Sequence, residues 1–494
     1  MKTTRSLLLG AVSLLGVACG PAVSGGDGGD GEGGANANDR SSGGEVGAVF
    51  GAAGPELVVS PSGRFVVTAS RRTPTIHDLE TETSIELSFL ADRVVFSRTR
   101  EVAYVVKSRL SGVVAIDLAT GAELWSSTPA LSTSAGSFLA KVTADDRALL
   151  LGDYDRVLVL DAQTGEVRGA RKVGAMPVDV EILPDQRHAV AVGSTRWDAV
   201  GPHTPVSLFD FEGRVSVTID VPNCAAPIVV LPGGDRALLS PTFCEAGKGP
   251  TAGSPPDAPP PPRDPVSVID IDVTAVGGAL RFVKNLPGFG PVALLPDARA
   301  VAYVDRDRVE APMFDDPSQI PPKDGPKHYL MVIEPRSMRF DLHPIGEALP
   351  RFAASRDGRA LLVDATVSLA REGEVKVTFG PSGVRAEASA GVFGQQALFG
   401  TFDLDTRRYA PFAGPAVSLD RFVQQEGGRV FALNATTGGG LFAIDLAART
   451  SEDLGRKAHD VGLLPDGRTL VLWTSDGLCL SQDGASCTKT IATR

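Results

Sequence analysis

The sequence predicts an all-β chain that folds as a single β-propeller of about eight four-stranded blades, within a range of about seven to nine. Three observations predict this fold. A β-hairpin pattern recurs along the 494 residues, a strand ending in aspartate follows most of its copies, and the composition favours turns. With 55 Gly, 36 Pro and 43% apolar residues, the chain has many turn formers and enough apolar side chains for a large core.

The recurring hairpin consists of an apolar strand, a turn that contains an arginine, and a second apolar strand. Successive turn arginines are 36 to 70 residues apart. Because closed rings usually have no more than about eight blades, we expect one copy to be an irregular excursion, or the first and last copies to share a blade. The nine copies are VVSPSGRFVVTAS (58–70), VFSRTREVAYVV (95–106), KVTADDRALLLG (141–152), EILPDQRHAVAVG (181–193), VVLPGGDRALLS (229–240), ALLPDARAVAYVD (293–305), FAASRDGRALLVD (352–364), FVQQEGGRVFALN (422–434) and GLLPDGRTLVLWT (462–474).

Most hairpins are followed by an apolar strand that ends in aspartate and then by a turn. Each unit therefore has four short strands, and units of about 40 residues with four strands are typical of propeller blades. An aspartate before a turn accepts backbone N–H bonds, which favours strand capping over a ring of catalytic carboxylates. The clearest copies end in Asp117, Asp161, Asp210, Asp270 and Asp445.

The hairpin together with the strand pattern VxVIDxxTG resembles the repeat of the YVTN and quinoprotein-like propeller superfamily, which is related to WD40-like repeats. The resemblance covers roughly residues 50–494. DLATGAELW (117–125) is similar to the D-x-x-T-G-x-x-x-W repeat of quinoprotein propellers, in which a tryptophan docks neighbouring sheets. Only Trp125 occupies that position among three tryptophans, so the resemblance does not imply a quinone cofactor, and we expect no cofactor.

The N-terminus is predicted to be an export signal. Lys2 and Arg5 precede a short apolar run, so residues 1–18 read as a signal peptide rather than a membrane span. The position of Cys19 resembles the lipobox of bacterial lipoproteins, and the alternative is ordinary cleavage near Ala18. Residues 19–47 are predicted to be a lipidated cysteine with a Gly/Asp-rich tether, and 48–494 the propeller. By analogy with lipoproteins, Gly20 favours the outer membrane of a Gram-negative bacterium, on its periplasmic or outer side.

The other four cysteines, in an oxidising compartment, are expected to form disulfides. Pairing by proximity gives Cys224 with Cys244 and Cys479 with Cys487, and the other two connectivities remain open. A zinc site is not expected, because the sequence has no C-x2-C pair.

Composition and motifs exclude several classes of function. The formal net charge is −11 and no Lys/Arg stripe is present, which argues against a nucleic-acid partner. The six histidines form no metal-hydrolase motif, and no nucleophile elbow or phosphate loop is found. We therefore expect a protein that is not an enzyme, with no catalytic and no metal-ligating residues.

Four consecutive units lengthen between their second and third strands, at 194–206, 241–265, 306–329 and 365–396. In a propeller these loops emerge on the face that also carries the blade-to-blade connections, so we expect them to form one binding wall. Four acidic residues of the third insertion could hold calcium, and a solvated acidic loop is the alternative. The candidate binding residues are Arg196, Trp197, His203, Arg306, Asp307, Glu310, Phe314, Asp315, Asp316, His328 and Tyr329.

These observations favour a non-enzymatic cell-envelope lipoprotein that binds a protein or glycan partner through this face and contacts the membrane only through its lipid. One alternative is a lactonase-like hydrolase with a metal in the central channel, which needs several of Asp153, Asp305, Asp364 and Asn434 to converge. The other is a scaffold for outer-membrane assembly, by analogy of fold and anchor.

Overall fold

The computed structural model describes residues 47–49 and 56–492, apart from 71–72, 108–111, 129–138, 198–201, 242–264, 296, 347–349, 355–359, 372–374, 381–382, 389–391, 414–420 and 435–439. The predicted signal peptide and Cys19 lie outside the described residues, and so does all of the tether except Gly47. Within the described residues, strands dominate and the helical elements are short 3₁₀ turns, which confirms the all-β class.

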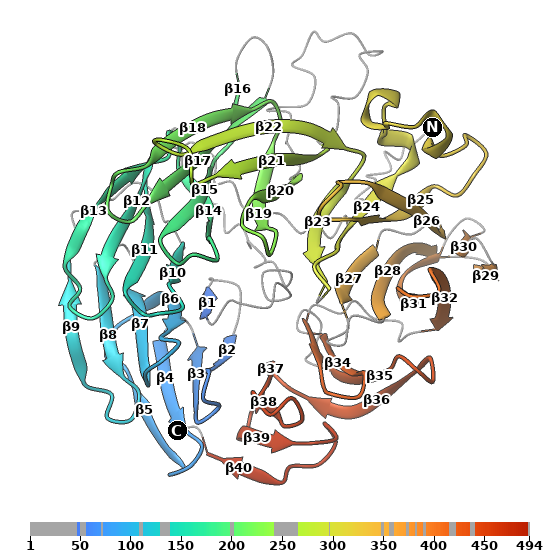
Figure 1. Cartoon of the computed structure of the whole chain (residues 1–494). Helices are drawn as coiled ribbons and strands as arrows, with labels where there is room; N and C mark the ends of the chain where they lie inside the picture. Colours follow the sequence, from blue (N-terminus) through green and yellow to red (C-terminus); the bar gives the residue numbers. More distant parts are fainter. Residues whose placement is uncertain are drawn as a thin grey trace, which may run out of the picture.

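The strands form nine sheets that follow one another around a ring (Figure 1). Each sheet contains four antiparallel strands, which we call A to D from the channel outward. Every hairpin copy in the sequence forms strands A and B of one sheet, so the described residues form nine blades, at the upper end of the expected range. The expected sharing of one blade is therefore not needed.

The blades have the following strands. Blade 1 has β2 (Glu56–Val59), β3 (Phe65–Ser70), β4 (Thr73–Asp78) and β5 (Thr83–Glu86); blade 2 has β6 (Ala91–Phe96), β7 (Val102–Lys107), β8 (Val113–Asp117) and β9 (Glu123–Ser127); blade 3 has β10 (Ala140–Val142), β11 (Ala148–Asp153), β12 (Arg156–Asp161) and β13 (Val167–Lys172). Blade 4 has β14 (Pro177–Ile182), β15 (His188–Gly193), β17 (Pro202–Asp210) and β18 (Ser216–Val221); blade 5 has β19 (Ala225–Val230), β20 (Arg236–Pro241), β21 (Val266–Asp272) and β22 (Ala279–Leu286); blade 6 has β23 (Phe289–Leu294), β24 (Ala300–Asp305), β25 (His328–Ile333) and β26 (Phe340–Gly346). Blade 7 has β27 (Pro350–Ala354), β28 (Ala360–Arg371), β31 (Val392–Asp403) and β32 (Arg408–Ala413); blade 8 has β33 (Arg421–Gln424), β34 (Arg429–Asn434), β35 (Gly440–Asp445) and β36 (Thr450–Lys457); blade 9 has β37 (Asp460–Leu463), β38 (Leu470–Thr474), β39 (Gly477–Ser481) and β40 (Lys489–Ile491).

Four strands and three short helices add to this frame. β1 (Gly47–Val49) pairs with β6 and extends blade 2 toward the channel, and β16 (Arg196–Trp197) pairs with β17 in blade 4. The hairpin of β29 (Val375–Gly380) and β30 (Gly383–Ala388) joins the outer edge of blade 6, where β30 pairs in parallel with β26. Between β24 and β25 lie the 3₁₀ helices η3 (Arg306–Arg308), η4 (Ala311–Met313) and η5 (Pro317–Gln319).

The core lies between the blades rather than inside them. The buried side chains of the described residues form nine apolar clusters, and each cluster is shared by two neighbouring blades. Phe65 of blade 1, for example, packs with Phe96 of blade 2, and both are fully buried. Because a buried Phe or Leu side chain contributes about 1.5–3 kcal/mol, each cluster binds its two blades firmly.

The last blade meets the first without exchanging a strand. The backbone N–H of Leu57 in β2 donates to Oδ2 of Asp460 in β37 at 2.7 Å, and Asp460 is fully buried. The same seam holds an apolar cluster that includes Leu57 and Trp473. A similar link joins blades 4 and 5, where the N–H of Ile228 donates to Asp179 at 2.9 Å.

A second contact recurs on the outer side of the seams. A side chain of strand D rests on the turn between strands C and D of the next blade. Trp125 covers Gly165 so closely that no side chain would fit there, and Ile85 does the same to Gly121. Arg171 occupies the corresponding place between blades 3 and 4 and donates to the carbonyl oxygen of Phe211 at 2.6 Å. The tryptophan slot of quinoprotein repeats is therefore kept, while its occupant changes from seam to seam.

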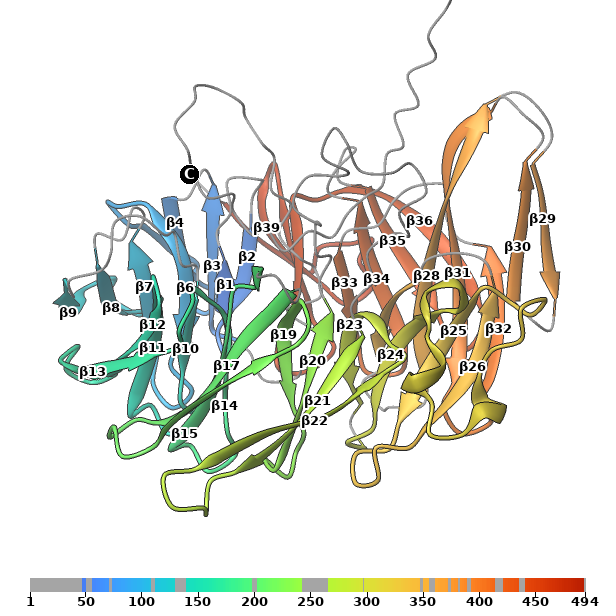
Figure 2. The ribbon, with the colours of Figure 1, turned by 90° about the horizontal axis from the view of Figure 1, so that it is seen from above.

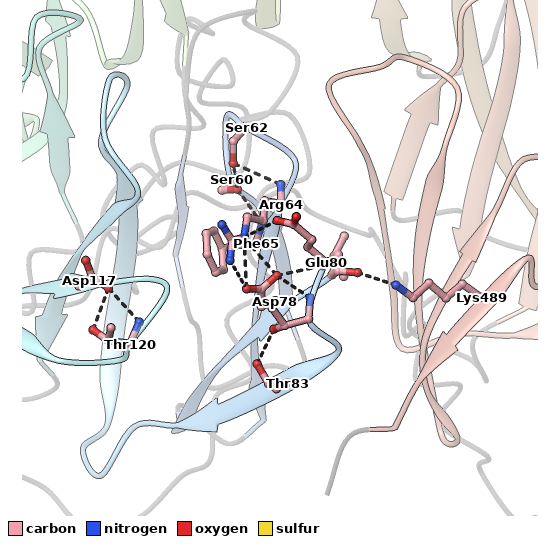
Figure 3. A network of polar contacts seen from close by, with 12 residues as sticks. Ser60, Ser62, Arg64, Phe65, Asp78, Glu80, Thr83, Asp117, Thr120 and Lys489 are labelled. Carbon is pink, nitrogen blue, oxygen red and sulfur yellow. Dashed lines mark hydrogen bonds and ion pairs between the residues drawn. The ribbon is translucent and has the colours of Figure 1, made fainter.

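At the closing seam this slot is filled by a lysine. Nζ of Lys489 in β40 donates to the carbonyl oxygen of Leu79 at 2.7 Å and lies 3.0 Å from a carboxylate oxygen of Glu82. Beside this contact, the Arg64 guanidinium lies 2.6 Å from Asp78 and lowers the pKa of that carboxyl group to about 2 (Figure 3). A polar network thus backs the apolar seam.

The predicted capping role of the repeated aspartates is confirmed for Asp117, Asp161, Asp210 and Asp445, which accept backbone N–H groups of the following turn at 2.6–3.1 Å. Asp270 instead forms ion pairs with Arg236 at 3.0 Å and Arg281 at 2.5 Å. Neither arrangement brings these carboxylates together.

Replacing Asp460 by alanine should destabilise the fold, because the N–H of Leu57 would stay buried without its acceptor. We expect a loss of about 1–3 kcal/mol in the free energy of unfolding, measured by urea denaturation. Asp466→Ala is the matched control, since Asp466 lies on an exposed turn of the same blade. An equal, small effect of both substitutions would contradict the closing role of Asp460.

His77 makes the fold sensitive to acid. Its buried ring bonds Thr68 and Ser84 at 2.8 Å, and burial lowers its pKa from 6.5 to about 4. The unfolded chain thus binds more protons between these values, so stability is full above pH 6.5 and falls as the pH drops toward 4. By linkage this amounts to about 3 kcal/mol. His77→Gln should flatten this part of the stability–pH curve in urea denaturation series, and an unchanged slope would refute the assignment.

Candidate functional site

The two faces of the ring differ in what they carry. The turns between strands A and B and between C and D lie on one face, which we call the turn face. The loops between B and C and the blade-to-blade connections lie on the other, which we call the insertion face. Figure 2 shows β28 and β31 rising beyond the other strands, with the β29–β30 hairpin beside them. The register pairs β28 and β31 along all twelve residues of each strand.

The first insertion, 194–206, forms a small hairpin on blade 4. Arg196 in β16 is the register partner of His203 in β17, and Trp197 pairs with Pro202. Arg196 is exposed and His203 is half-buried. The Arg196 guanidinium reaches the connection between blades 3 and 4, because its Nη2 atom lies 3.7 Å from the point where a Cβ on Gly174 would sit. This predicted candidate therefore stands at the boundary of two blades.

The second insertion, 241–265, lies outside the described residues except for Pro241 and Pro265. The third insertion, 306–329, folds onto the side of the propeller. Phe314 is buried and its ring meets that of Phe340 in β26 edge to face, 5.9 Å between centroids. Asp315 binds Lys284 of β22 at 2.6 Å. The insertion thus bridges the outer strands of blades 5 and 6.

The candidate residues of this insertion divide into packed and exposed ones. Phe314, His328 and Tyr329 are buried, and the His328 ring shares a hydrogen bond with the hydroxyl group of Tyr303. Burial raises the pKa of the Tyr303 hydroxyl, which keeps it neutral. Exposed or half-exposed are Arg306, Asp307, Glu310, Asp315 and Asp316.

The exposed acidic residues mostly serve local structure. Asp307 lies 3.1 Å from Arg306, and Asp316 accepts the N–H of Ser318 at 2.8 Å as the cap of η5. A small pocket at the base of the insertion is lined by Asp305, Arg308, Val309 and Met313, together with Gly288 and two prolines. Within it, Asp305 and Arg308 form an ion pair at 2.9 Å. The two charged residues that line the pocket thus neutralise each other.

Converging ligands for a channel metal were the requirement of the hydrolase alternative. In the part of the chain that the structure describes, no group of three or more His, Cys, Asp or Glu residues is placed to share a cation. Asp153 pairs with Arg156 at 2.8 Å and Asp305 with Arg308, each within its own blade. Asn434 is buried at the end of β34 in blade 8.

One feature of the insertion face was missed by sequence reasoning. Tyr154 forms the two-residue turn between β11 and β12, its side chain is 57% exposed, and its φ is +26°. Such tight turns usually take Gly, Asn or Asp at positions of positive φ. The only sequence signal is therefore a tyrosine where a small turn residue is typical.

The disulfide predictions are partly confirmed. Cys479 and Cys487 form a disulfide with their Cα atoms 5.4 Å apart, which ties β39 to the turn before β40. Cys224 is also disulfide-bonded, and its partner lies outside the described residues, as does Cys244. The pairing of Cys224 with Cys244 stays a prediction.

Comparison with solved structures finds several chains of similar fold. The crystal structure of a eukaryotic initiation factor has a TM-score of 0.50 and 9% identity, covering 82% of this chain and 89% of that one. The Dos1 propeller has a TM-score of 0.41 and 9% identity (88% and 93% covered), and the Kuenenia stuttgartiensis hydrazine synthase 0.38 and 13% (71% and 96%). At these identities the likeness concerns the fold alone.

By sequence, no curated protein matches this chain. A family model described as outer membrane protein assembly factor BamB, a PQQ-type repeat, matches residues 109–190. The matched stretch contains Trp125 and Gly165, which form the tryptophan contact between blades 2 and 3. The chain is thus a β-propeller, and its residues 109–190 match a quinoprotein-like repeat model.

Proposed function

We propose that this chain is a non-enzymatic lipoprotein of the cell envelope whose propeller binds a protein partner through its insertion face. The observation that carries the proposal is the asymmetry of the ring. The turn face is built of short turns that satisfy their own polar groups, whereas the insertion face bears β16, the extended β28–β31 pair and the β29–β30 hairpin.

Two further observations support a binding role. The matched repeat model describes an assembly factor, which is a protein that works through other proteins. The blades also form a ring of nine shared clusters, so loops on one face are held by a rigid scaffold, as in many binding proteins. Such a scaffold presents separate loops at fixed distances to one partner.

Removal of the β29–β30 hairpin should weaken partner binding without unfolding the ring. Arg371 and Val392 are register partners, so an Asn-Gly turn in place of residues 372–391 closes the hairpin cleanly. We expect at least a tenfold lower recovery of the partner from detergent-solubilised envelope, quantified by mass spectrometry.

The matched control shortens the turn face instead. Asp272 and Ala279 are register partners, and Asn-Gly in place of residues 273–278 removes the exposed Val276. This variant should recover the partner as the wild type does. Loss of binding in both variants, or in the control alone, would contradict the assignment to the insertion face.

We further propose that Cys19 anchors the chain to the outer membrane through lipid. The described residues include no helix long and apolar enough to cross a membrane. An acyl anchor on a Gly-rich segment would hold the ring away from the bilayer, so the insertion face stays accessible.

Replacing Cys19 by serine should move the protein from the membrane pellet to the soluble periplasmic fraction, because no acyl chain can attach. Incorporation of labelled palmitate into the wild type, and not into the variant, measures the modification directly. Unchanged sedimentation of Cys19→Ser with the membrane would refute the lipid anchor.

A further inference from the structure

We infer that the insertion-face end of the seam between blades 3 and 4 is a docking site for an acidic segment of the partner protein. The site is centred on Tyr154, Lys172 and Arg196, which we call the seam patch. The inference rests on the proposed function, and it adds a position and a chemistry to it.

The three residues come from three segments that meet at this seam. The carbonyl oxygen of Asp155, next to Tyr154, accepts the N–H groups of Val173 and Gly174 at 2.8 and 3.2 Å. This connection directly follows Lys172. Arg196 of blade 4 also approaches Gly174, with Nη2 3.7 Å from the place of a Cβ. Turn, connection and hairpin thus form one continuous surface.

A tyrosine at position 154 contributes little to the stability of the fold. A positive φ in a residue other than glycine costs about 1–3 kcal/mol in the strained cases, and asparagine or glycine would adopt the turn with less strain. Because the side chain is 57% exposed, it recovers little of that cost by burial. An exposed aromatic ring on a strained turn instead suits a contact with another molecule, and Tyr and Arg are enriched at the centres of protein interfaces.

The charged groups around the seam patch indicate the chemistry of the segment that it binds. The segments 153–156, 172–174 and 194–197 carry three cations and two carboxylates, and Asp153 is already paired with Arg156 at 2.8 Å. Arg196 and Lys172 are exposed, and neither forms an ion pair with another described residue. In a chain of net charge −11, this is a basic and aromatic spot on an acidic protein. It complements a segment rich in Asp and Glu rather than a basic one.

Site-directed photocrosslinking with the full-length protein tests the inference. A benzophenone side chain replaces Tyr154 in one protein and Val276, on the turn face, in another, and both are irradiated in solubilised envelope. We expect a single protein to be linked at 154 and not at 276, through a segment of net negative charge. Arg196→Glu should lower the yield at 154 about tenfold. Arg214→Glu, an exposed arginine on the turn face of blade 4, should not change it.

The outcomes separate the two proposals. If Arg196→Glu leaves the yield unchanged, or the linked segment is neutral, basic or carbohydrate, the seam patch is overturned. The proposed function would still stand if loss of the β29–β30 hairpin abolishes partner recovery. If the hairpin deletion leaves partner recovery unchanged and the crosslinker at 154 links no protein, both proposals fail.

Tyr154→Asn separates binding from folding at the same position. Because asparagine tolerates a positive φ, the midpoint of thermal unfolding should equal or exceed that of the wild type. Recovery of the partner from detergent-solubilised envelope should nevertheless fall severalfold. A lower midpoint with unchanged recovery would make Tyr154 a folding residue and overturn its role in the patch.

Discussion

A buried hydrogen bond between Leu57 and Asp460 joins residues from the two ends of the ring, and the architecture depends on the closure to which it belongs. Among the described residues no blade has a core of its own, because every apolar cluster is shared by two neighbours. An open seam would therefore expose the faces of two blades at once. Neither end blade lends a strand to the other in the part of the chain that the structure describes. The closing seam is held by the side chains of Asp460 and Lys489 and by the Leu57–Trp473 cluster.

The two faces of the ring have different roles: the turns of one stabilise the fold, and the connections of the other vary between blades. On the turn face, aspartates such as Asp161 and Asp210 accept backbone N–H groups, and strand D side chains press on the next turn. These carboxylates and backbone N–H groups are therefore already hydrogen-bonded within the protein. On the insertion face the connections differ in length between blades, so a change in one of them leaves the clusters between the blades intact. Variation for binding is accordingly tolerated on one face only.

The sequence was sufficient for the fold because a propeller repeats its local signals: each hairpin copy became strands A and B of one blade. The site was harder to predict, for physical reasons. Phe314 and Tyr329 lie in an insertion, yet they belong to the apolar cluster shared by blades 5 and 6, which no local pattern reveals. Arg171 and Lys489 fill the tryptophan slot because a long cationic side chain can also reach a turn carbonyl. Tyr154 could not be predicted as a site residue, because the feature that marks it is a positive φ, which only the structure shows.

The seam between blades 3 and 4 illustrates how stability and binding can be separated in one interface. At its turn-face end, the buried Arg171 donates to the carbonyl oxygens of Asp210 and Phe211 at 2.9 and 2.6 Å, and between the blades lies a cluster with Phe209 and Val180. None of these contacts involves Tyr154, Lys172 or Arg196. Binding rather than stability can therefore determine the residues at positions 154, 172 and 196. The strained Tyr154 is tolerated because other contacts already stabilise the seam.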